Sequence, residues 1–489
     1  MKSKNYVQPS GFQFYTRPYA HQKIAFDYLR ANPKAGLLME MGTGKTKVVI
    51  DYLSWRRDQN LSPDRVLWIA PNSILEKEDE EFRKHTSPKM LSDNFRIAIL
   101  RGTKQRRLRI LNEYSDTDCP CTVVITNYES LRSLLRDLIL WKPNIVILDE
   151  SSRIKNGRAQ QSKACHLLGR VAQVKVIMTG TPVTQSPADI FSQYKFLDPL
   201  VFGESFIVFR YHYLVMGGFK GKQVVGYKNI EELNRKVYSR AIRFTKAECL
   251  DLPPKIYKVY RYDLTPEQAR VYKDLAEELV SEFQKGLITV AQAVVKIIRF
   301  SQICSGFVGM DPTDESPKKI EEFSPNPKLE LLKDILGEIR PHKLVIWCRY
   351  IHEIELLRDY FRNIYREIEN VITFYGATPK EDRMKLVNDF NKSEQSQVFI
   401  GQIRTGGLGI DLIGSDKVIY FSNTYSLEDR IQSEDRCHRI GQTKKVLYID
   451  LIGRGTIEES VMRVLNKKQN LADIITRTNI SSILQGDAK

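Results

Sequence analysis

The sequence contains little cysteine: there are seven cysteines in 489 residues, and only Cys119 and Cys121 lie close together. No two of them form a CxxC pair. An odd number of scattered cysteines argues against a disulfide framework and against a zinc ribbon. We therefore expect a reduced, intracellular protein without structural zinc, located in the host cytoplasm if its source is viral.

Long apolar runs are also missing. No stretch approaches the ~18–20 residues that a bilayer helix needs, and residues 1–15 lack the apolar segment of a secretory signal. Glycine and proline number 27 and 20, far below the ~25–30% typical of low-complexity sequence. With 42% hydrophobic residues the chain can bury a full core, and at ~150 residues per domain its length suits about three domains. These features exclude a disordered chain and a membrane-spanning one.

Acidic residues are outnumbered by basic ones, 59 to 75, which gives a net charge of +16. The excess is concentrated in three segments, 101–109, 153–163 and 235–246, which contain no acid. Cationic surfaces attract phosphate backbones and release their counterions. The clustering favours a polyanionic partner, whereas net charge alone is equally consistent with a basic protein that is merely soluble.

Two blocks of short apolar runs indicate buried strands. Each run is bounded by polar or turn residues and separated from the next by a helix-length amphipathic stretch, a pattern typical of a parallel α/β sheet. The expected strands of the first block are 35–39, 65–70, 95–100, 122–126, 144–148 and 174–178. Those of the second block are 343–347, 371–374, 397–400, 417–421 and 446–451.

Between about 185 and 335 helical periodicity replaces this rhythm, as in 266–285, which follows the N-cap candidate Thr265. Residues 311–327, rich in proline, serine and charge, are typical of a surface loop or linker. The fold class that we expect is α/β, with two parallel-sheet lobes and a helical region between them. The predicted boundaries are 1–200 for the first lobe, 201–325 for the helical region and 326–489 for the second lobe.

A glycine-rich loop follows the first expected strand and opens a helix. Its residues are Met41, Gly42, Thr43, Gly44, Lys45 and Thr46. The glycines let backbone amides turn toward phosphate oxygens, and the helix N-terminus adds positive potential. Lys45 would neutralise the β- and γ-phosphates of ATP, and the Thr46 hydroxyl would ligate Mg²⁺. Because Met39 stands where the full pattern has glycine, a simple glycine turn is the alternative.

Two acids, Asp149 and Glu150, follow the expected strand 144–148. The carboxyl end of a buried strand is where ligands bind in open α/β sheets. Asp149 suits the organisation of Mg²⁺ through water, and Glu150 suits the polarisation of an attacking water. Alone, such a pair is more often a helix cap. Together with Lys45 and Thr46, on what we expect to be a neighbouring strand, it predicts an ATP site.

An arginine-rich stretch, 429–442, lies in the second block. On a helix, Gln432, Arg436 and Arg439 fall on one stripe of one face, and Gly441 would end that helix. Presented across an inter-lobe cleft, such arginines could contact the γ-phosphate and stabilise transition-state charge. ATP would then close the cleft and hydrolysis would release it. A solvated charged face is the alternative.

Together these segments resemble helicase superfamily 2, and specifically its Swi/Snf-like branch of DNA translocases. The resemblance covers nearly the whole chain. The segments that match in order are 17–22, 41–46, 68–73, 126–129, 149–152, 179–182, 403–412 and 429–442. Three further stretches favour this branch over other helicases, namely 243–255, 437–445 and 455–459.

The resemblance implies two RecA-like lobes, the use of ATP and Mg²⁺, and tracking along double-stranded DNA without strand separation. The residues implied at the nucleotide are Gln22, Met41, Gly42, Thr43, Gly44, Lys45, Thr46, Gly407 and Gln432, with Thr46 and Asp149 at the metal. The implied catalytic residues are Lys45, Asp149, Glu150, Arg436 and Arg439. Candidates for contact with the DNA backbone are Asn72, Arg101, Thr126, Asn127, Gly376 and Thr405. Backbone contact carries no base information, which suits a motor that must pass any sequence.

The chain departs from the pattern of this branch at two positions. Ser152 replaces the histidine expected to couple the acids to 179–182, and Asp411 stands where asparagine is frequent. Since both acids are retained, we expect ATP chemistry to persist and the coupling of the lobes to differ.

The most direct expectation is an ATP-driven translocase on double-stranded DNA that remodels DNA or protein–DNA complexes. One alternative is a branch-migration or fork-regressing helicase built on the same motor and acting on branched DNA. A second alternative is a DNA-binding scaffold that nucleotide switches without processive movement. Because one chain carries both halves of the ATP cleft, a monomer suffices.

Overall fold

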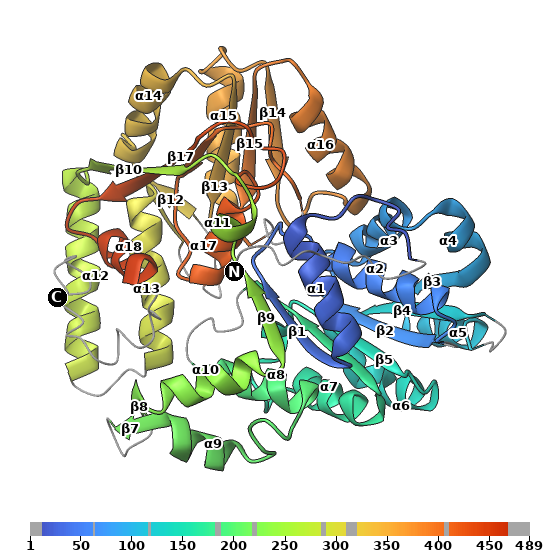
Figure 1. The fold of residues 1–489 in the computed structure, drawn as a ribbon. Helices are drawn as coiled ribbons and strands as arrows, with labels where there is room; N and C mark the ends of the chain where they lie inside the picture. The colour runs from blue at the N-terminus through green and yellow to red at the C-terminus, as the bar shows by residue number, and fades with distance from the viewer. Residues whose placement is uncertain are drawn as a thin grey trace. The chain divides into compact units, whose positions relative to one another are not determined.

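The computed structural model describes residues 12–61, 64–115, 119–180, 187–217, 223–284, 290–309, 320–404 and 410–467 (Figure 1). The chain divides into two compact units, the first unit Met1–Asp251 and the second unit Leu252–Lys489. Among the described helices, none is long and apolar enough to cross a membrane.

In the described part of the first unit, seven parallel strands form one sheet in the order β3-β4-β2-β5-β6-β1-β9. The strands are β1 (Lys34–Met39), β2 (Asp64–Ala70), β3 (Phe95–Ile99), β4 (Cys121–Asn127), β5 (Ile145–Asp149), β6 (Val174–Met178) and β9 (Ala241–Phe244). The central strands are buried along almost their whole length, as their continuous apolar runs require in a sheet covered on both faces. Because all strands are parallel, their carboxyl ends meet at one edge.

Helices cover both faces of this sheet. They are α1 (Ala20–Ala31), α2 (Lys45–Asp58), α3 (Leu75–His85), α4 (Pro88–Asn94), α5 (Lys104–Glu113), η1 (Tyr128–Ser130), α6 (Leu131–Leu140), η2 (Ser151–Ile154), α7 (Gln160–Val171), α8 (Asp189–Leu197), α9 (Phe206–Tyr213), α10 (Ile230–Tyr238) and α11 (Lys246–Cys249). An antiparallel hairpin of β7 (Leu214–Gly217) and β8 (Gln223–Tyr227) follows α9.

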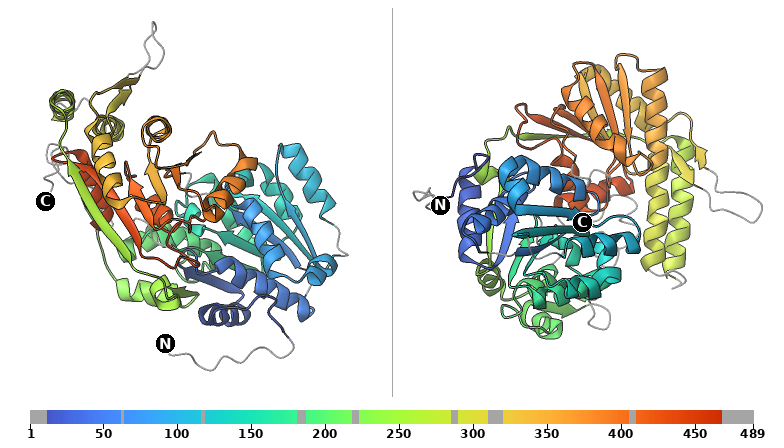
Figure 2. Two further views of the ribbon diagram at one scale, coloured as in Figure 1. Left: turned by 90° about the horizontal axis from the view of Figure 1, so that it is seen from above. Right: turned by 90° about the vertical axis from the view of Figure 1, so that its right-hand side faces the viewer.

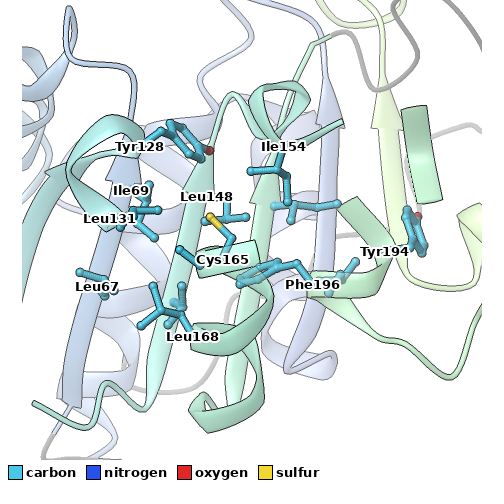
Figure 3. Packing of buried hydrophobic residues seen from close by; sticks show 14 of the residues in the cluster. Leu67, Ile69, Tyr128, Leu131, Leu148, Ile154, Cys165, Leu168, Tyr194 and Phe196 are labelled. Carbon is cyan, nitrogen blue, oxygen red and sulfur yellow. The ribbon is translucent and has the colours of Figure 1, made fainter. Parts of the chain in front are cut away.

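Each face of the sheet has its own core. Trp68 packs on the face covered by α1, α2 and α3, whereas its neighbour Leu67 packs on the face covered by α6, α7 and α8. Successive residues of a strand point to opposite faces, so one strand serves both cores. Figure 3 shows the second core, in which Cys165 and Leu168 of α7 meet Leu148 of β5.

The described part of the second unit contains a parallel sheet in the order β10-β17-β16-β13-β15-β14. Its strands are β10 (Lys255–Tyr262), β13 (Lys343–Cys348), β14 (Asn370–Phe374), β15 (Gln397–Gln402), β16 (Lys417–Tyr420) and β17 (Val446–Gly453). Its helices are α12 (Pro266–Gln284), α13 (Val290–Cys304), α14 (Pro327–Ile339), α15 (Ile351–Asn363), α16 (Lys380–Lys392), α17 (Leu427–Glu434) and α18 (Ile457–Lys467). A short antiparallel hairpin joins β11 (Phe307–Gly309) and β12 (Ile320–Glu322).

Three helices of the second unit form a cluster beside this sheet. The helices α12 and α13 run side by side, as the right-hand view of Figure 2 shows. They bury Leu279, Phe300 and Ile303 together with Val461 of α18. At the start of α12, the Thr265 hydroxyl accepts a hydrogen bond from the Gln268 backbone N–H at 3.2 Å, which confirms the expected N-cap.

The expected fold class is confirmed, since every predicted apolar run lies in a strand of one of the two parallel sheets. The short hairpin strands β7, β8, β11 and β12 were not predicted from the sequence. Nor were two strands of these parallel sheets: β9 pairs with β1, and β10 pairs with β17. Both lie within 201–325, where we expected helices, and each forms the edge of a different sheet. The three domain boundaries themselves stay a prediction.

Candidate active site

The glycine-rich loop connects β1 to α2 at the carboxyl edge of the first sheet. Gly42 and Gly44 have φ angles of 79° and 84°, in the left-handed region that side chains with a Cβ adopt only at a cost. These two glycines let the chain reverse between Met39 and Lys45, where α2 begins. The free N–H groups at the start of that helix can therefore face an anion.

Gln22 holds this loop from α1. Its side-chain amide donates to the Thr43 carbonyl at 3.0 Å and accepts from the Tyr19 backbone N–H at 2.9 Å. The His21 ring also bonds the Thr43 carbonyl, at 2.8 Å. A Cβ added at Gly44 would overlap the Gln22 amide nitrogen. Gln22, predicted at the nucleotide, is thus in direct contact with the phosphate loop.

Lys45 is buried, and its ammonium donates to the Met39 carbonyl at 2.9 Å and to the Glu40 carbonyl at 3.5 Å. The side chain thus lies across the mouth of its own loop, within reach of the space that the loop encloses. Thr46 is half-buried in the first turn of α2. A cation and a hydroxyl placed in this way fit the phosphates and the magnesium ion of a bound nucleotide.

Asp149 ends β5 and is 5% exposed, and Glu150 follows it with a φ of 49°. The Glu150 backbone N–H donates to Asp149 Oδ1 at 3.0 Å, and the Tyr128 hydroxyl donates to the Asp149 carbonyl at 2.7 Å. Burial, with a further contribution from the Glu150 charge, raises the pKa of Asp149 to about 7, and Lys45 acts in the opposite direction. A divalent cation beside Asp149 would offset the free-energy cost of keeping this buried carboxylate charged. The residues present therefore fit Mg²⁺.

The phosphate loop follows β1 and the two acids follow β5, and these strands are not adjacent in the sheet, contrary to our expectation. Strand β6 lies between β1 and β5 in the sheet. Its end passes close to the phosphate loop, because the Thr179 N–H donates to the Leu37 carbonyl at 3.2 Å. A Cβ at Gly180 would also lie 3.1 Å from the Met41 backbone nitrogen. The segment 179–182 therefore begins between the loop and the acids; Thr181 and Pro182 lie outside the described residues.

A third carboxyl was missed by the sequence analysis. Glu78 of α3 is 2% exposed, and its pKa is raised well above the usual range by burial and by the charges of Asp149 and Glu81. On α3 it occupies the same face as the buried Leu75 and Phe82. An acid at an apolar position of an amphipathic helix is the signal that would have indicated it.

The arginine-rich stretch is not one helix, which corrects our expectation. Helix α17 ends at Glu434, so Arg436 and Arg439 lie in the turns that follow, and Gly441 does not terminate that helix. Arg436 is 3% exposed, and its Nη1 donates to the Ile410 carbonyl at 3.5 Å. Arg439 forms an ion pair with Asp411. The stripe of Gln432, Arg436 and Arg439 is therefore wrong as helix geometry, and the roles of these residues stay predictions.

Arg430 of α17 anchors this segment. Its guanidinium bonds Asp450 at 2.5 and 3.0 Å and Glu434 at 2.8 Å, and it lies 3.5 Å from the centroid of the Tyr420 ring. Glu434 also accepts from the Lys255 ammonium at 2.9 Å. This buried network joins α17 to β10, β16 and β17. It fixes the start of the turns that carry Arg436.

Several predicted DNA contacts lie at the carboxyl ends of three adjacent strands. Asn72 follows β2, Arg101 follows β3, and Asn127 ends β4. The structure brings two of them together, because the Asn127 amide donates to Asn72 Oδ1 at 3.0 Å. Arg101 forms an ion pair with Glu76.

The remaining DNA candidates differ in accessibility. Thr126 is fully buried, and its hydroxyl has no hydrogen-bond partner among the described residues, so its side chain does not reach the surface. Gly376 lies in a turn after β14, where an added Cβ would meet no described atom within 4 Å. Thr405, together with the nucleotide candidate Gly407, lies outside the described residues.

The departure at Ser152 places a buried side chain in η2, with 3% exposure. Its neighbour Ser151 donates to Gln193 Oε1 of α8 at 2.7 Å. Asp411, the second departure, supplies the carboxylate that pairs with Arg439. An asparagine there would be neutral, so this departure changes the electrostatics of the predicted arginine finger.

Two family profiles match the chain: the SNF2-related domain over residues 19–306 and the helicase conserved C-terminal domain over residues 327–441. The chain is similar to the ATP-dependent helicase fft1 of Schizosaccharomyces pombe, with 26% identity over 527 residues that cover 96% of this chain and 54% of that protein. It is also similar to the ISWI chromatin-remodeling complex ATPase ISW2 of Saccharomyces cerevisiae, with 26% identity over 461 residues that cover 91% and 39%.

The chain thus spans about half the length, or less, of the curated relatives that it matches. Among solved structures it is similar to the Sulfolobus solfataricus SWI2/SNF2 ATPase core in complex with dsDNA, with 24% identity and a TM-score of 0.44. That match covers 98% of this chain and 96% of the other.

Proposed function

The chain belongs to the SNF2-related family of helicase-like ATPases. On that premise we propose that it couples ATP hydrolysis to movement along double-stranded DNA. The observation that carries the proposal is the edge of the first sheet. There the phosphate loop and the pair Asp149–Glu150 share one edge with Asn72, Arg101 and Asn127. The site of ATP hydrolysis and the residues that contact the DNA backbone would then lie on the same rigid sheet.

The hydrolytic step is assigned to the first unit. The loop amides and Lys45 hold the β- and γ-phosphates, and Lys45 exchanges its hydrogen bonds to the Met39 and Glu40 carbonyls for phosphate oxygens. Glu150 orients and polarises the water that attacks the γ-phosphorus. Thr46 and Asp149 are the residues that would hold Mg²⁺, which would supply positive charge against the negative charge that develops on the phosphates.

Arg436 and Arg439 of the second unit are proposed to stabilise the transition state. A guanidinium that reaches the γ-phosphate offsets charge spread over its oxygens. Arg439 must exchange its ion pair with Asp411 for a phosphate oxygen. The ion pair with Asp411 would therefore hold the Arg439 side chain in place while no nucleotide is bound.

DNA is proposed to lie along the carboxyl edge of β3, β4 and β2. Asn72 and Asn127 would donate amide hydrogens to phosphates, and Arg101 would exchange Glu76 for the backbone. Helix α5 follows directly and exposes Lys104, Arg106 and Arg109, which extends the cationic surface. Such contacts are indifferent to base sequence and weaken steeply with salt.

The test is multiple-turnover ATP hydrolysis in the presence of single-stranded, linear duplex, forked and four-way DNA. We expect strong stimulation by blunt linear duplex and displacement of a triplex-forming strand from it. Selective stimulation by forked or four-way DNA would instead identify a branch-migration enzyme. Turnover that ends after one ATP would identify a nucleotide-switched scaffold, and either result refutes the translocase.

Variants assign the roles. Lys45→Ala and Glu150→Gln should abolish turnover while leaving the fold intact. Arg439→Ala should lower turnover by about 10²-fold or more, the scale at which loss of one transition-state donor acts. Arg454→Ala is the matched control, because Arg454 is an exposed arginine of the same unit paired with Asp263. Equal turnover in these two arginine variants would refute the finger assignment.

A further inference from the structure

A second cluster of basic residues lies at the opposite end of the first sheet from the phosphate loop. Lys34 is the first residue of β1, and Lys175 lies beside it in register on β6. At ~3.3 Å per residue, the length of β1 separates this end from the active site by roughly 20 Å. The cluster therefore plays no part in the ATP chemistry proposed above.

These lysines line a cavity of about 270 Å³. Its floor is the start of β1 and β6, and its walls come from α7, α8 and the segment after α8. The lining side chains include Lys34, His166, Arg170, Lys175, Lys195 and Glu204. We call this space the basal cavity.

The basal cavity carries more positive charge than its own carboxylate offsets. Four cationic side chains line it against the single acid Glu204. Burial lowers the pKa of His166, whose Nε2 lies 3.0 Å from the Ser192 carbonyl. The imidazole therefore lines the cavity in its uncharged form, and the lysine and arginine side chains set the electrostatic potential of the cavity.

Most of these cations already have partners at its rim. Lys34 pairs with Asp198 at 3.1 Å, and Asp198 is shared with Arg240 at 3.0 Å. Arg170 pairs with Glu204 at 3.1 Å, and the Lys195 ammonium donates to the Glu204 backbone carbonyl at 2.8 Å. These contacts hold the three side chains in place; the exposed Arg170–Glu204 pair gains little from pairing, whereas Lys34 is bound to the buried Asp198.

Lys175 is the exception. It is 5% exposed, and within the described part of the chain its ammonium has neither a hydrogen bond nor an ion pair within 4 Å. Burial and the neighbouring Lys34 lower its pKa to about 8, and the charge of Asp198, which Lys34 and Arg240 already share, acts weakly in the opposite direction. Buried charges are normally paired, so a buried lysine that faces a cavity and bonds no carboxylate among the described residues is suited to receive an anion.

We propose that the basal cavity binds a compact phosphate anion, with Lys175 at its base and Arg170 and Lys195 at its rim. A tetrahedral oxyanion offers several acceptor oxygens, which match the converging ammonium and guanidinium donors. The volume is below the ~300–1,000 Å³ of pockets for drug-sized ligands, which suits inorganic phosphate or pyrophosphate. A duplex backbone is a poorer match, since a buried lysine lies beneath the surface that a duplex contacts.

The test is calorimetric titration of the full chain with inorganic phosphate at constant ionic strength. All proteins carry Lys45→Ala, so that the phosphate loop does not contribute. In this background we expect one binding site for phosphate. Lys175→Met should lower the affinity of that site for phosphate about ten-fold or more. Arg170→Gln, on an exposed side chain that does not threaten folding, should weaken it as well. Lys163→Met is the matched control, because Lys163 is an exposed lysine of α7 outside the cavity and should leave binding unchanged.

Two further titrations distinguish the source of the phosphate. Pyrophosphate should compete with inorganic phosphate, and the affinity for linear duplex should be the same with and without Lys175→Met. The proposal is overturned if the Lys45→Ala protein binds no phosphate, or if Lys175→Met and Lys163→Met bind it equally. It is also overturned if Lys175→Met weakens duplex binding alone. None of these results depends on ATP turnover, so they do not bear on the proposed translocase.

Discussion

Replacing Gly44 by alanine tests whether Gln22 and the phosphate loop act as one unit. Gly44 has φ 84° and ψ 39°, a left-handed conformation that costs an alanine about 1–2 kcal/mol. The new Cβ would also displace the Gln22 amide. Gln22 would then lose its hydrogen bonds to Thr43 and Tyr19, each contributing about 1 kcal/mol. The expected destabilisation of the first unit is about 3–4 kcal/mol.

Gly203 supplies the matched control. Its φ is 77°, and a Cβ added there would meet no described atom within 4 Å. Gly203→Ala should therefore show the backbone cost alone, about 1–2 kcal/mol. For a unit of this size each kcal/mol lowers Tm by roughly 2–4 °C, so calorimetry separates the two variants. The KM for ATP should rise in Gly44→Ala and stay unchanged in Gly203→Ala.

A double-mutant cycle assigns the difference to Gln22. In a Gln22→Ala background the amide is gone, and Gly44→Ala should cost no more than Gly203→Ala does. The coupling energy between positions 22 and 44 should thus be about 2 kcal/mol. If Gly44→Ala costs the same with and without Gln22, or the same as Gly203→Ala, the contact between α1 and the loop is not what positions the loop.

Three further predictions concern stability. Arg430→Met leaves Asp450, 1% exposed, without its cation and should destabilise the second unit by about 3–5 kcal/mol, measured by thermal unfolding. Burial raises the pKa of Asp51 to about 6, so the folded state binds a proton that the unfolded state has released. The free energy of unfolding should therefore fall by about 2 kcal/mol between pH 4 and 6, and Asp51→Asn should remove this slope in urea titrations. Gly169→Ala places a Cβ 2.9 Å from the Phe196 ring and should lower the stability by about 1–3 kcal/mol, seen as a lower Tm.

Matched variants accompany these predictions. Arg454→Met removes an exposed arginine from the same unit and should change Tm little. Gly337 lies within α14 with no described atom within 4 Å of an added Cβ, so Gly337→Ala should stabilise by about 0.5–1 kcal/mol. A loss of Tm in Gly337→Ala equal to that in Gly169→Ala would contradict the steric argument. A fall in stability from pH 4 to 6 of the same size in wild type and Asp51→Asn would contradict the assignment of the slope.

The sheet strands followed from the sequence because their signal is local. Runs such as 145–148 and 344–347 are apolar throughout, since a strand covered on both faces has no polar side. Two of the four edge strands, β9 and β10, escaped detection because they lack a continuous apolar run. Most of β10 is exposed, with polar residues between its apolar ones, and only its pairing with β17, almost 200 residues later, makes it a strand.

The candidate site likewise contains residues that a local sequence pattern indicates and residues that only the tertiary structure brings to the site. Lys45, Thr46, Asp149 and Glu150 could be found because a phosphate loop and an acid-ended strand each occupy a few consecutive residues. Glu78 has only a weak sequence signal, an acid on the apolar face of α3, and its proximity to Asp149 arises only once α3 packs on the sheet. The helix expected to carry Arg436 also failed as a prediction, because periodicity does not show where tertiary contacts end a helix.

What the amino-acid order alone determined was the set of segments: which runs become strands, where the phosphate loop turns, and which family the chain resembles. Those properties depend on side-chain polarity and backbone freedom over five to ten consecutive residues. The tertiary structure alone decided what lies beside what: β6 between the loop and the acids, Gln22 against Gly44, and Lys175 beside Lys34 at the start of the sheet, with no bonded carboxylate among the described residues. Burial and electrostatic pairing arise between residues far apart in the chain, and so they exist only once the sheet has assembled.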